Sequence, residues 1–387
     1  MDQKIIQLFP DLGKDLNSFY TTGILPSQNI DELVKTKHIS AGIPVTSEQI
    51  QPSSIDLRLG PVAYRVRASF LTGEGSTVYK KVDAFRMHEV DLSRSSVLEK
   101  GCVYIVPLLE ELSLPPKMSA KANPKSTTGR LDIFTRLLTD YGTEFERVKP
   151  GYQGKLYVEI VPRTFSILVH EGTKLNQLRF IQGESLASDS DLSELDQKER
   201  LVYSEQDMPE DPNISNNSLW ISIDLQTDHG SEIIGYKAKR HAPLVDLDQI
   251  NFYDPLEFWE PIRRPETNHI ILEPDDFYIL ASKEKIRVPP GFAAEMVPYD
   301  PTVGEFRIHY AGFFDPGFGY GKNDIKGTRA VLEVRSHEVP FVLEHGQTVG
   351  RLIYERLLHT PAKIYGVGIG SSYQSQGLSL SKQFKRF

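Results

Sequence analysis

The sequence predicts a mainly β protein made of two tandem β-barrel domains with a few short helices. Short stretches that alternate apolar and polar residues recur between glycine and proline turns, as in Ile55–Gly60. The length of 387 residues exceeds what one small core needs. The pattern also restarts at a constant offset of 174 residues, so that Leu98 matches Leu272 and Glu159 matches Glu333. We therefore expect two copies of one β-domain.

Composition and charge narrow the range of partners. The net charge of −8 would repel polyanions, so no nucleic acid partner is expected. Neither an apolar run of about 20 residues nor a cationic leader is visible, and we expect no membrane contact and a cytoplasmic location. The single cysteine, Cys102, lies in an apolar stretch and is interpreted as a core residue. One cysteine also excludes disulfides and any multi-cysteine zinc site.

Taken in order, the chain changes character three times. A short apolar piece before Pro10 predicts a helical turn or arm, and Asp31 and Glu32 fit the first turn of a short helix. Strands then dominate up to Phe180, before a segment rich in Ser, Asp and Glu that is typical of a solvated connector. The expected parts are a first domain with its N-terminal arm over 1–182, an acidic linker over 183–217, a second domain over 218–360 and a polar tail over 361–387.

Two segments of the first copy carry chemistry. Lys125–Leu131 gathers hydroxyls, a glycine and two cations, which suits a phosphate or a polarised carbonyl. The turn Gly151–Gly154 leads into a strand that delivers Glu159 within an otherwise apolar stretch. A carboxylate placed there is costly unless it is paired or used. The second copy lacks the cationic loop, because Glu305 stands where the first copy has Arg130.

These segments, in this order and spacing, resemble the dCTP deaminase branch of the dUTPase-like superfamily in a two-copy form. The resemblance covers Gly23–Phe180, more loosely Ile271–Leu357, and the final tail, and it rests on Gln51–Gly60, Lys125–Leu131 and Gly151–Glu159. It implies two dUTPase-like barrels and hydrolytic deamination of dCTP to dUTP and ammonia without catalytic zinc. It also implies a homo-oligomer, either a trimer or a pseudo-threefold assembly.

The resemblance assigns roles to individual residues. Glu159 would be the general base, Arg130 would orient it and the developing oxyanion, and Ser126 would fix the water or the amine. The other expected substrate contacts are Lys125, Thr127, Gly129, Tyr152, Gln177, Tyr373 and Gln376. No protein-held metal is expected, since Mg²⁺ would bind through the substrate triphosphate, and the tail would fold over it as a lid. Besides dCTP, dUTP or dTTP are the nucleotides that such a site would accept.

Two residues depart from the family pattern, and the aspartate missing at Lys149 counts against a dUTP diphosphatase, which shares the fold. Lys149 stands where the family usually has an aspartate that holds the sugar 3′-hydroxyl, and Lys125 stands where an arginine is usual. A dUTP diphosphatase and a non-catalytic nucleotide-binding or regulatory protein are the alternative functions. Because the second copy lacks the cationic loop of the first, we predict that the second copy is structural. Asp315 and Glu333 are nevertheless candidates for a composite site at a domain interface.

Overall fold

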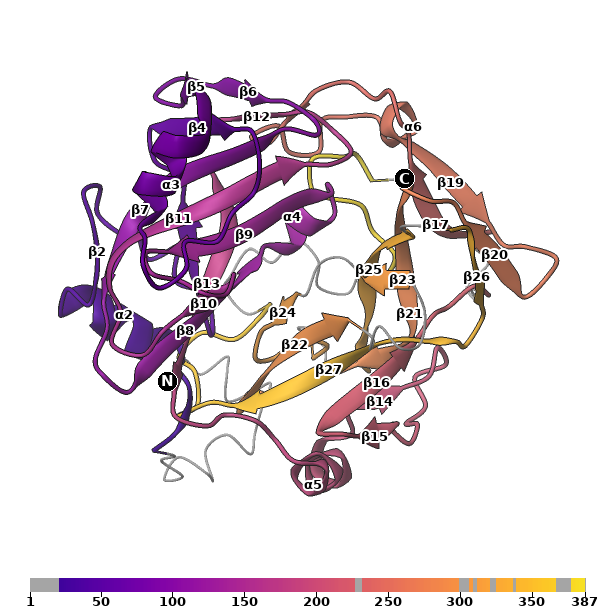
Figure 1. Ribbon diagram of the computed structural model, residues 1–387. Coiled ribbons are helices and arrows are strands. Elements are labelled where there is room, and N and C mark those ends of the chain that lie inside the picture. The colour runs from indigo at the N-terminus through magenta and orange to yellow at the C-terminus, as the bar shows by residue number, and fades with distance from the viewer. Residues whose placement is uncertain are drawn as a thin grey trace.

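The computed structural model describes residues 21–226, 232–298, 306–308, 312–320, 325–336, 339–366 and 377–386. The predicted mainly β fold is confirmed, since strands far outnumber helices in this part of the chain. Two copies of the β-domain lie against each other, the first purple and the second orange to yellow in Figure 1. No helix among the described residues is long and apolar enough to cross a membrane.

The first copy is built from two sheets around an apolar core that continues into Phe258, Trp259 and Phe277 of the second copy. One sheet contains β1 (Gly23–Ile24), β3 (Ile55–Arg58), β8 (Met118–Pro124), β10 (Arg147–Val148) and β13 (Lys174–Gln182). The other contains β2 (Ile39–Ala41), β4 (Val62–Val66), β5 (Arg86–Asp91), β7 (Val103–Ser113), β9 (Ile133–Thr139) and β11 (Gln153–Pro162). A small third sheet joins β6 (Ser96–Leu98) and β12 (Ile167–Val169) to β18 (Val245–Asp246), and the helices are α2 (Ser27–Lys35), α3 (Val78–Phe85) and α4 (Ser126–Gly129).

The second copy repeats this plan around a core of its own. One sheet contains β14 (Val202–Tyr203), β17 (Ile233–Ala238), β19 (Trp259–Arg263), β21 (Phe277–Ile286), β23 (Phe306–Ile308) and β25 (Thr328–Ser336). The other contains β15 (Ile214–Ser215), β16 (Ser218–Ser222), β22 (Phe292–Pro298), β24 (Phe313–Phe314) and β27 (Thr348–Arg356), and β20 (His269–Leu272) pairs with β26 (Phe341–Glu344).

The strand register shows that the repeat is structural as well as sequential. Glu159 on β11 lies opposite Ile105 on β7, and Glu333 on β25 lies opposite Ile279 on β21. Both pairs keep the offset of 174 residues. The two glutamates therefore hold equivalent places in the two domains.

The acidic segment that was expected to be a connector forms α5 (Asp189–Glu199). Ser188 and Asp191 form a capping box at its first turn, which satisfies backbone N–H groups that the helix leaves open. Leu192 is buried in the core of the second copy. Composition alone predicts solvation here because apolar side chains are few. It does not take into account that these few are spaced to lie on one face of a helix.

Buried arginines tie the two copies together. Arg179 on β13 donates to the carbonyl of Phe314 at 3.4 Å and to the Glu355 carboxylate at 3.2 Å. In the opposite direction, Arg335 on β25 reaches the Asp132 carboxylate of the first copy. Each copy thus inserts a cation into the other, which fixes their relative position.

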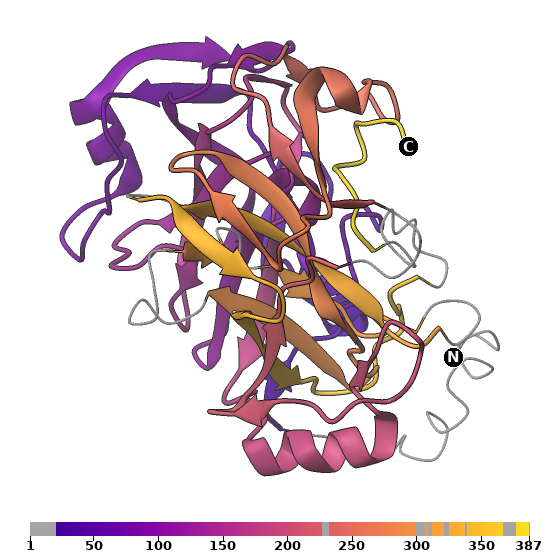
Figure 2. The ribbon, with the colours of Figure 1, turned by 90° about the vertical axis from the view of Figure 1, so that its right-hand side faces the viewer.

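The C-terminal tail packs against the second copy. Phe384 is buried and packs edge-on against Phe258 of α6 (Pro255–Phe258) at 5.2 Å between ring centroids and against Trp259 at 5.8 Å. Figure 2 shows this yellow segment running beside α6. The end of the described chain is therefore part of the packed structure.

Candidate functional site

The hydroxyl-rich loop of the first copy forms a single helical turn, α4, that is fixed to β13. The backbone N–H of Lys125 and the hydroxyl of Thr128 both donate to the Leu175 carbonyl, at 2.9 and 2.8 Å. Arg130 follows as the C-cap of the turn. This anchoring directs the Arg130 side chain toward the second copy and the tail.

Arg130 of the first copy lies within electrostatic range of Glu333 of the second copy. Arg130 is buried and donates from Nη1 to the Ser379 hydroxyl at 2.6 Å and to the Ser379 carbonyl at 3.1 Å. Glu333 on β25 is 7% exposed. Burial raises the pKa of Glu333 to about 7, and the positive charge of Arg130 limits this rise. A carboxyl group that exchanges a proton near neutrality beside a guanidinium meets the demands of general acid–base catalysis.

Glu159, the expected base, has a different cation. It is fully buried on β11 and accepts hydrogen bonds from Arg136 Nε at 3.0 Å and Nη2 at 2.6 Å. Arg136 lies directly opposite Glu159 on the neighbouring strand β9, and its guanidinium stacks 3.6 Å from the ring centroid of Phe145. The sequence analysis missed Arg136, although two strands joined by a turn offered the signal that their charged residues could face each other.

In the repeated turn, the second copy has Asp315 where the first copy has Lys149. Lys149 is exposed, whereas Asp315 accepts a hydrogen bond from the Ser53 hydroxyl at 2.7 Å. Burial raises the pKa of Asp315, and the charges of Arg179 and then Lys125 oppose this rise. Asp315 therefore lies within electrostatic range of the first-copy loop.

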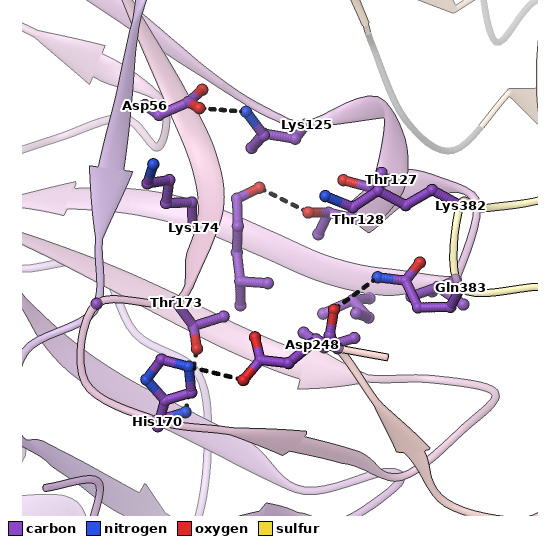
Figure 3. Close-up of a pocket in the computed structure, with 15 residues that line it drawn as sticks. Asp56, Lys125, Thr127, Thr128, His170, Thr173, Lys174, Asp248, Lys382 and Gln383 are labelled. Atoms are coloured by element: carbon purple, nitrogen blue, oxygen red, sulfur yellow. Dashed lines mark hydrogen bonds and ion pairs between the residues drawn. The ribbon is translucent and has the colours of Figure 1, made fainter. Parts of the chain in front are cut away.

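A cavity of about 300 Å³ opens beside the same loop (Figure 3). Lys125 forms an ion pair with Asp56 at 2.5 Å, and burial together with the charge of Lys125 lowers the pKa of Lys382. Lys174 adds a third ammonium group, so the positively charged side chains outnumber the carboxylates Asp56 and Asp248. The lining is Asp56, Lys125, Thr127, Thr128, Leu131, Ile133, His170, Gly172, Thr173, Lys174, Leu175, Leu247, Asp248, Lys382 and Gln383. Such a lining suits a phosphate chain.

The remaining predicted residues fall into three groups. Ser126 is exposed at the start of α4, and the Thr127 carbonyl accepts a hydrogen bond from Ser381 of the tail at 3.2 Å. Gly129 is buried within the turn, and Gln177 is buried on β13. Tyr152 donates its hydroxyl to the Lys155 carbonyl at 2.6 Å, which occupies it within the first copy.

Tyr373 and Gln376 lie outside the described residues. Among the described residues, no three His, Cys, Asp or Glu side chains are grouped so that they could hold a metal ion.

Comparisons with known proteins agree with this architecture. Residues 21–184 match the family model of the 2′-deoxycytidine 5′-triphosphate deaminase N-terminal domain, and residues 188–384 match that of the C-terminal domain. The chain is similar to the crystal structure of 2′-deoxycytidine 5′-triphosphate deaminase from Agrobacterium tumefaciens. Their sequences are 53% identical, the TM-score is 0.83, and the match covers 87% of this chain and 100% of the other.

Shorter curated relatives match as well. A dCTP deaminase, dUMP-forming, from Nanoarchaeum equitans is 26% identical over 177 residues, which is 41% of this chain and 84% of the relative. A dCTP deaminase from Halorubrum lacusprofundi is 32% identical over 117 residues, which is 30% of this chain and 54% of the relative. With both domain models matched along almost its whole length, the chain belongs to the dCTP deaminase family of hydrolytic deaminases, in its two-domain form.

Proposed function

We propose that this protein deaminates dCTP to dUTP and ammonia at a composite site, to which the first copy contributes its loop and the second copy its carboxylates. The observation that carries this proposal is that the buried Glu333 lies within electrostatic range of the buried Arg130 of the other copy, with a pKa of about 7 that suits a proton-transfer group. Glu159 is less suited to that role, because its carboxylate already accepts two hydrogen bonds from Arg136.

In this mechanism the ionised Glu333 takes a proton from water, and the hydroxide adds to C4 of cytosine. Glu333 delivers that proton to N3, and the hydroxyl proton passes to the amino group, which leaves as ammonia. The oxygen remains on C4 as the carbonyl of uracil, and Glu333 is ionised again. Arg130 would stabilise the negative charge that develops at the attacking oxygen, and the exposed Ser126 hydroxyl would hold the water or the amine.

The phosphates would follow the lysines of the cavity. Lys125 and Lys382 lie on two of its walls, and Asp315 stands where it would bind the sugar 3′-hydroxyl, as the resemblance implies. A magnesium ion would enter with the triphosphate, which supplies most of its ligands. Asp56 would be available to the bound nucleotide and its ion, because its Oδ1 is buried and lacks a hydrogen-bond partner among the described residues.

A dUMP product is the second candidate, favoured by the relatives that are named dUMP-forming and by the place of Asp315. That product requires a second hydrolysis at phosphorus, with water activated near the sugar. Asp315 is one carboxylate in that region, but its raised pKa weakens it as a base at low pH.

One assay separates these reactions. The protein is incubated with dCTP and, separately, with dUTP, and ammonia, pyrophosphate and the nucleotide products are measured. Ammonia and dUTP without pyrophosphate are expected from dCTP, and no reaction from dUTP. Pyrophosphate together with dUMP would establish the second candidate, and dUTP cleavage without any release of ammonia from dCTP would identify a diphosphatase. Turnover is expected to survive a zinc-selective chelator.

A further inference from the structure

A second ion pair crosses between the copies next to Arg130 and Glu333. Asp132 lies two residues after Arg130, and Arg335 lies two residues after Glu333. Arg335 Nη2 donates to Asp132 Oδ2 and, at 3.1 Å, to the hydroxyl of Thr164. Asp132 is 1% exposed and Arg335 is 4% exposed, so solvent screens this pair little.

Both partners are held rigidly on their own side. Asp132 has a left-handed backbone (φ 54°), its N–H donates to the Gly129 carbonyl at 2.9 Å, and its carbonyl accepts from the Arg163 N–H at 2.9 Å. A left-handed residue with a side chain is uncommon and persists when its surroundings fix it. Arg335 also donates to the Asp275 carbonyl. The ion pair between Asp132 and Arg335 therefore joins two segments that are each held by backbone hydrogen bonds.

Strand geometry connects this bridge with the proposed catalytic groups. Side chains two positions apart on a strand project from the same face, so Glu333 and Arg335 point toward the first copy together. Asp132 follows directly on the turn that presents Arg130. The distance between Arg130 and Glu333 thus depends on how Asp132 and Arg335 meet.

We propose that Asp132 and Arg335 form a positioning pair that sets Arg130 opposite Glu333 for the deamination. The inference rests on the proposed function. Without Arg335, the Asp132 carboxylate would be buried without its cation, two residues from Arg130. It would then draw the guanidinium away from Glu333. Small displacements of catalytic groups are costly, since a shift of about 1 Å can lower a rate about 100-fold.

The test uses the full chain and steady-state release of ammonia from dCTP as a function of pH. Arg335→Met is expected to lower kcat roughly 10- to 100-fold, with a smaller change in KM. It should also move the acidic limb of the kcat profile to higher pH. The reason is that Arg130, once drawn toward Asp132, would lower the pKa of Glu333 less. Arg335→Lys, which keeps the charge but not the planar fork, should fall between this variant and the wild type.

The double variant Asp132→Asn/Arg335→Met separates positioning from simple packing. It removes the competing carboxylate, so Arg130 should return to Glu333, and kcat and the pH profile should recover in part. Lys121→Met is the matched control, since it breaks the ion pair with Glu295, which also joins the two copies. We expect this control to leave kcat and its pH profile close to wild type, and urea unfolding reports whether each variant folds.

Three results would overturn the inference. They are an unchanged kcat and pH profile in Arg335→Met, an equal loss in Lys121→Met, and no recovery in the double variant. If Arg335→Met does not fold, Arg335→Lys and the double variant decide by the same criteria. A wild-type protein that releases no ammonia from dCTP would instead refute the proposed function and the inference with it, so the two failures are distinguishable.

Discussion

Glu159 and Glu333 occupy the same place in the repeated strand, yet their carboxyl groups meet cations of different origin. The partner of Glu159 is Arg136, from the adjacent strand of the same sheet, and the two form close hydrogen bonds. The nearby cation of Glu333 is Arg130, from the other copy. The first arrangement is an internal ion pair, and the second lies where two domains meet.

Strand position alone therefore does not assign chemistry to a buried carboxylate. A cation within the same sheet is in place when the domain folds, as Arg136 is at Oε1 of Glu159. A cation supplied across an interface leaves room for a substrate, and the buried Glu333 keeps a pKa of about 7. We therefore propose Glu333, whose cation comes from the other copy, as the reactive carboxylate.

The sharpest way to break this comparison is to neutralise each glutamate in turn. Glu333→Gln should lower kcat by about 10²- to 10⁴-fold, as expected for the loss of a general base, while dCTP binding measured by calorimetry persists. Glu159→Gln should leave kcat close to wild type. Equal losses would mean that both copies are catalytic, and a loss confined to Glu159→Gln would restore the assignment made from the sequence.

Removing the cation of the internal pair should affect stability more than turnover. Arg136→Met leaves the buried Glu159 carboxylate without its partner and should lower the free energy of unfolding by about 3 kcal/mol, measured in urea. The estimate lies at the low end for such pairs because the Arg136 side chain is 26% exposed. Arg86→Met, in the exposed pair with Glu89, is the control and should cost less than about 1 kcal/mol. Similar costs in both variants would contradict a structural role for the Arg136–Glu159 pair.

The pH dependence of stability should distinguish the copies as well. Glu333 has a raised pKa in the folded protein, so its contribution to stability is fully present below the usual value of 4.5 and is lost as the pH rises through about 7. Between pH 5 and pH 8 the wild type should lose on the order of 2 kcal/mol relative to Glu333→Gln in urea titrations. Parallel curves for the two proteins would show that Glu333 does not titrate in this range.

The smallest expected effect concerns the tail. Ser379→Ala removes a hydrogen bond to Arg130 and should reduce kcat/KM about fivefold, which corresponds to about 1 kcal/mol. Ser193→Ala on α5, whose hydroxyl bonds only within its own helix, is a matched control. If both variants match the wild type, the tail does not steady Arg130.

Much of the fold follows from the sequence because strand alternation and the offset of 174 residues are local or periodic signals. The loop Lys125–Leu131 was also identified from its residues, and the structure places it beside a cavity with three lysines. The proposed pairing of that loop with Glu333 could not be derived in the same way. It depends on how two domains dock, and the docking is set by buried contacts such as Asp132 with Arg335, which are far apart in sequence.

A signal for the composite site was nevertheless present. The first copy keeps the loop but has Lys149 in the turn, while the second copy has lost the loop but keeps Asp315. Complementary losses of this kind are expected if two half-sites act together, as we propose. The sequence also predicts a structural second copy, from the repulsion that Glu305 would exert in a loop of its own, and the Glu333→Gln variant decides between this prediction and the composite site.

The hydrogen bond between Arg130 and Ser379 spans 249 residues, and that between Arg335 and Asp132 spans 203 residues. Contacts of such long sequence separation form late in folding, because the chain must close large loops before they contribute any stabilisation. During refolding, each barrel can acquire its strands independently while Arg130 still lacks these partners. Secondary structure is therefore a poor measure of recovered activity in this protein. The delay between the recovery of secondary structure and the recovery of activity reports on the docking of the domains.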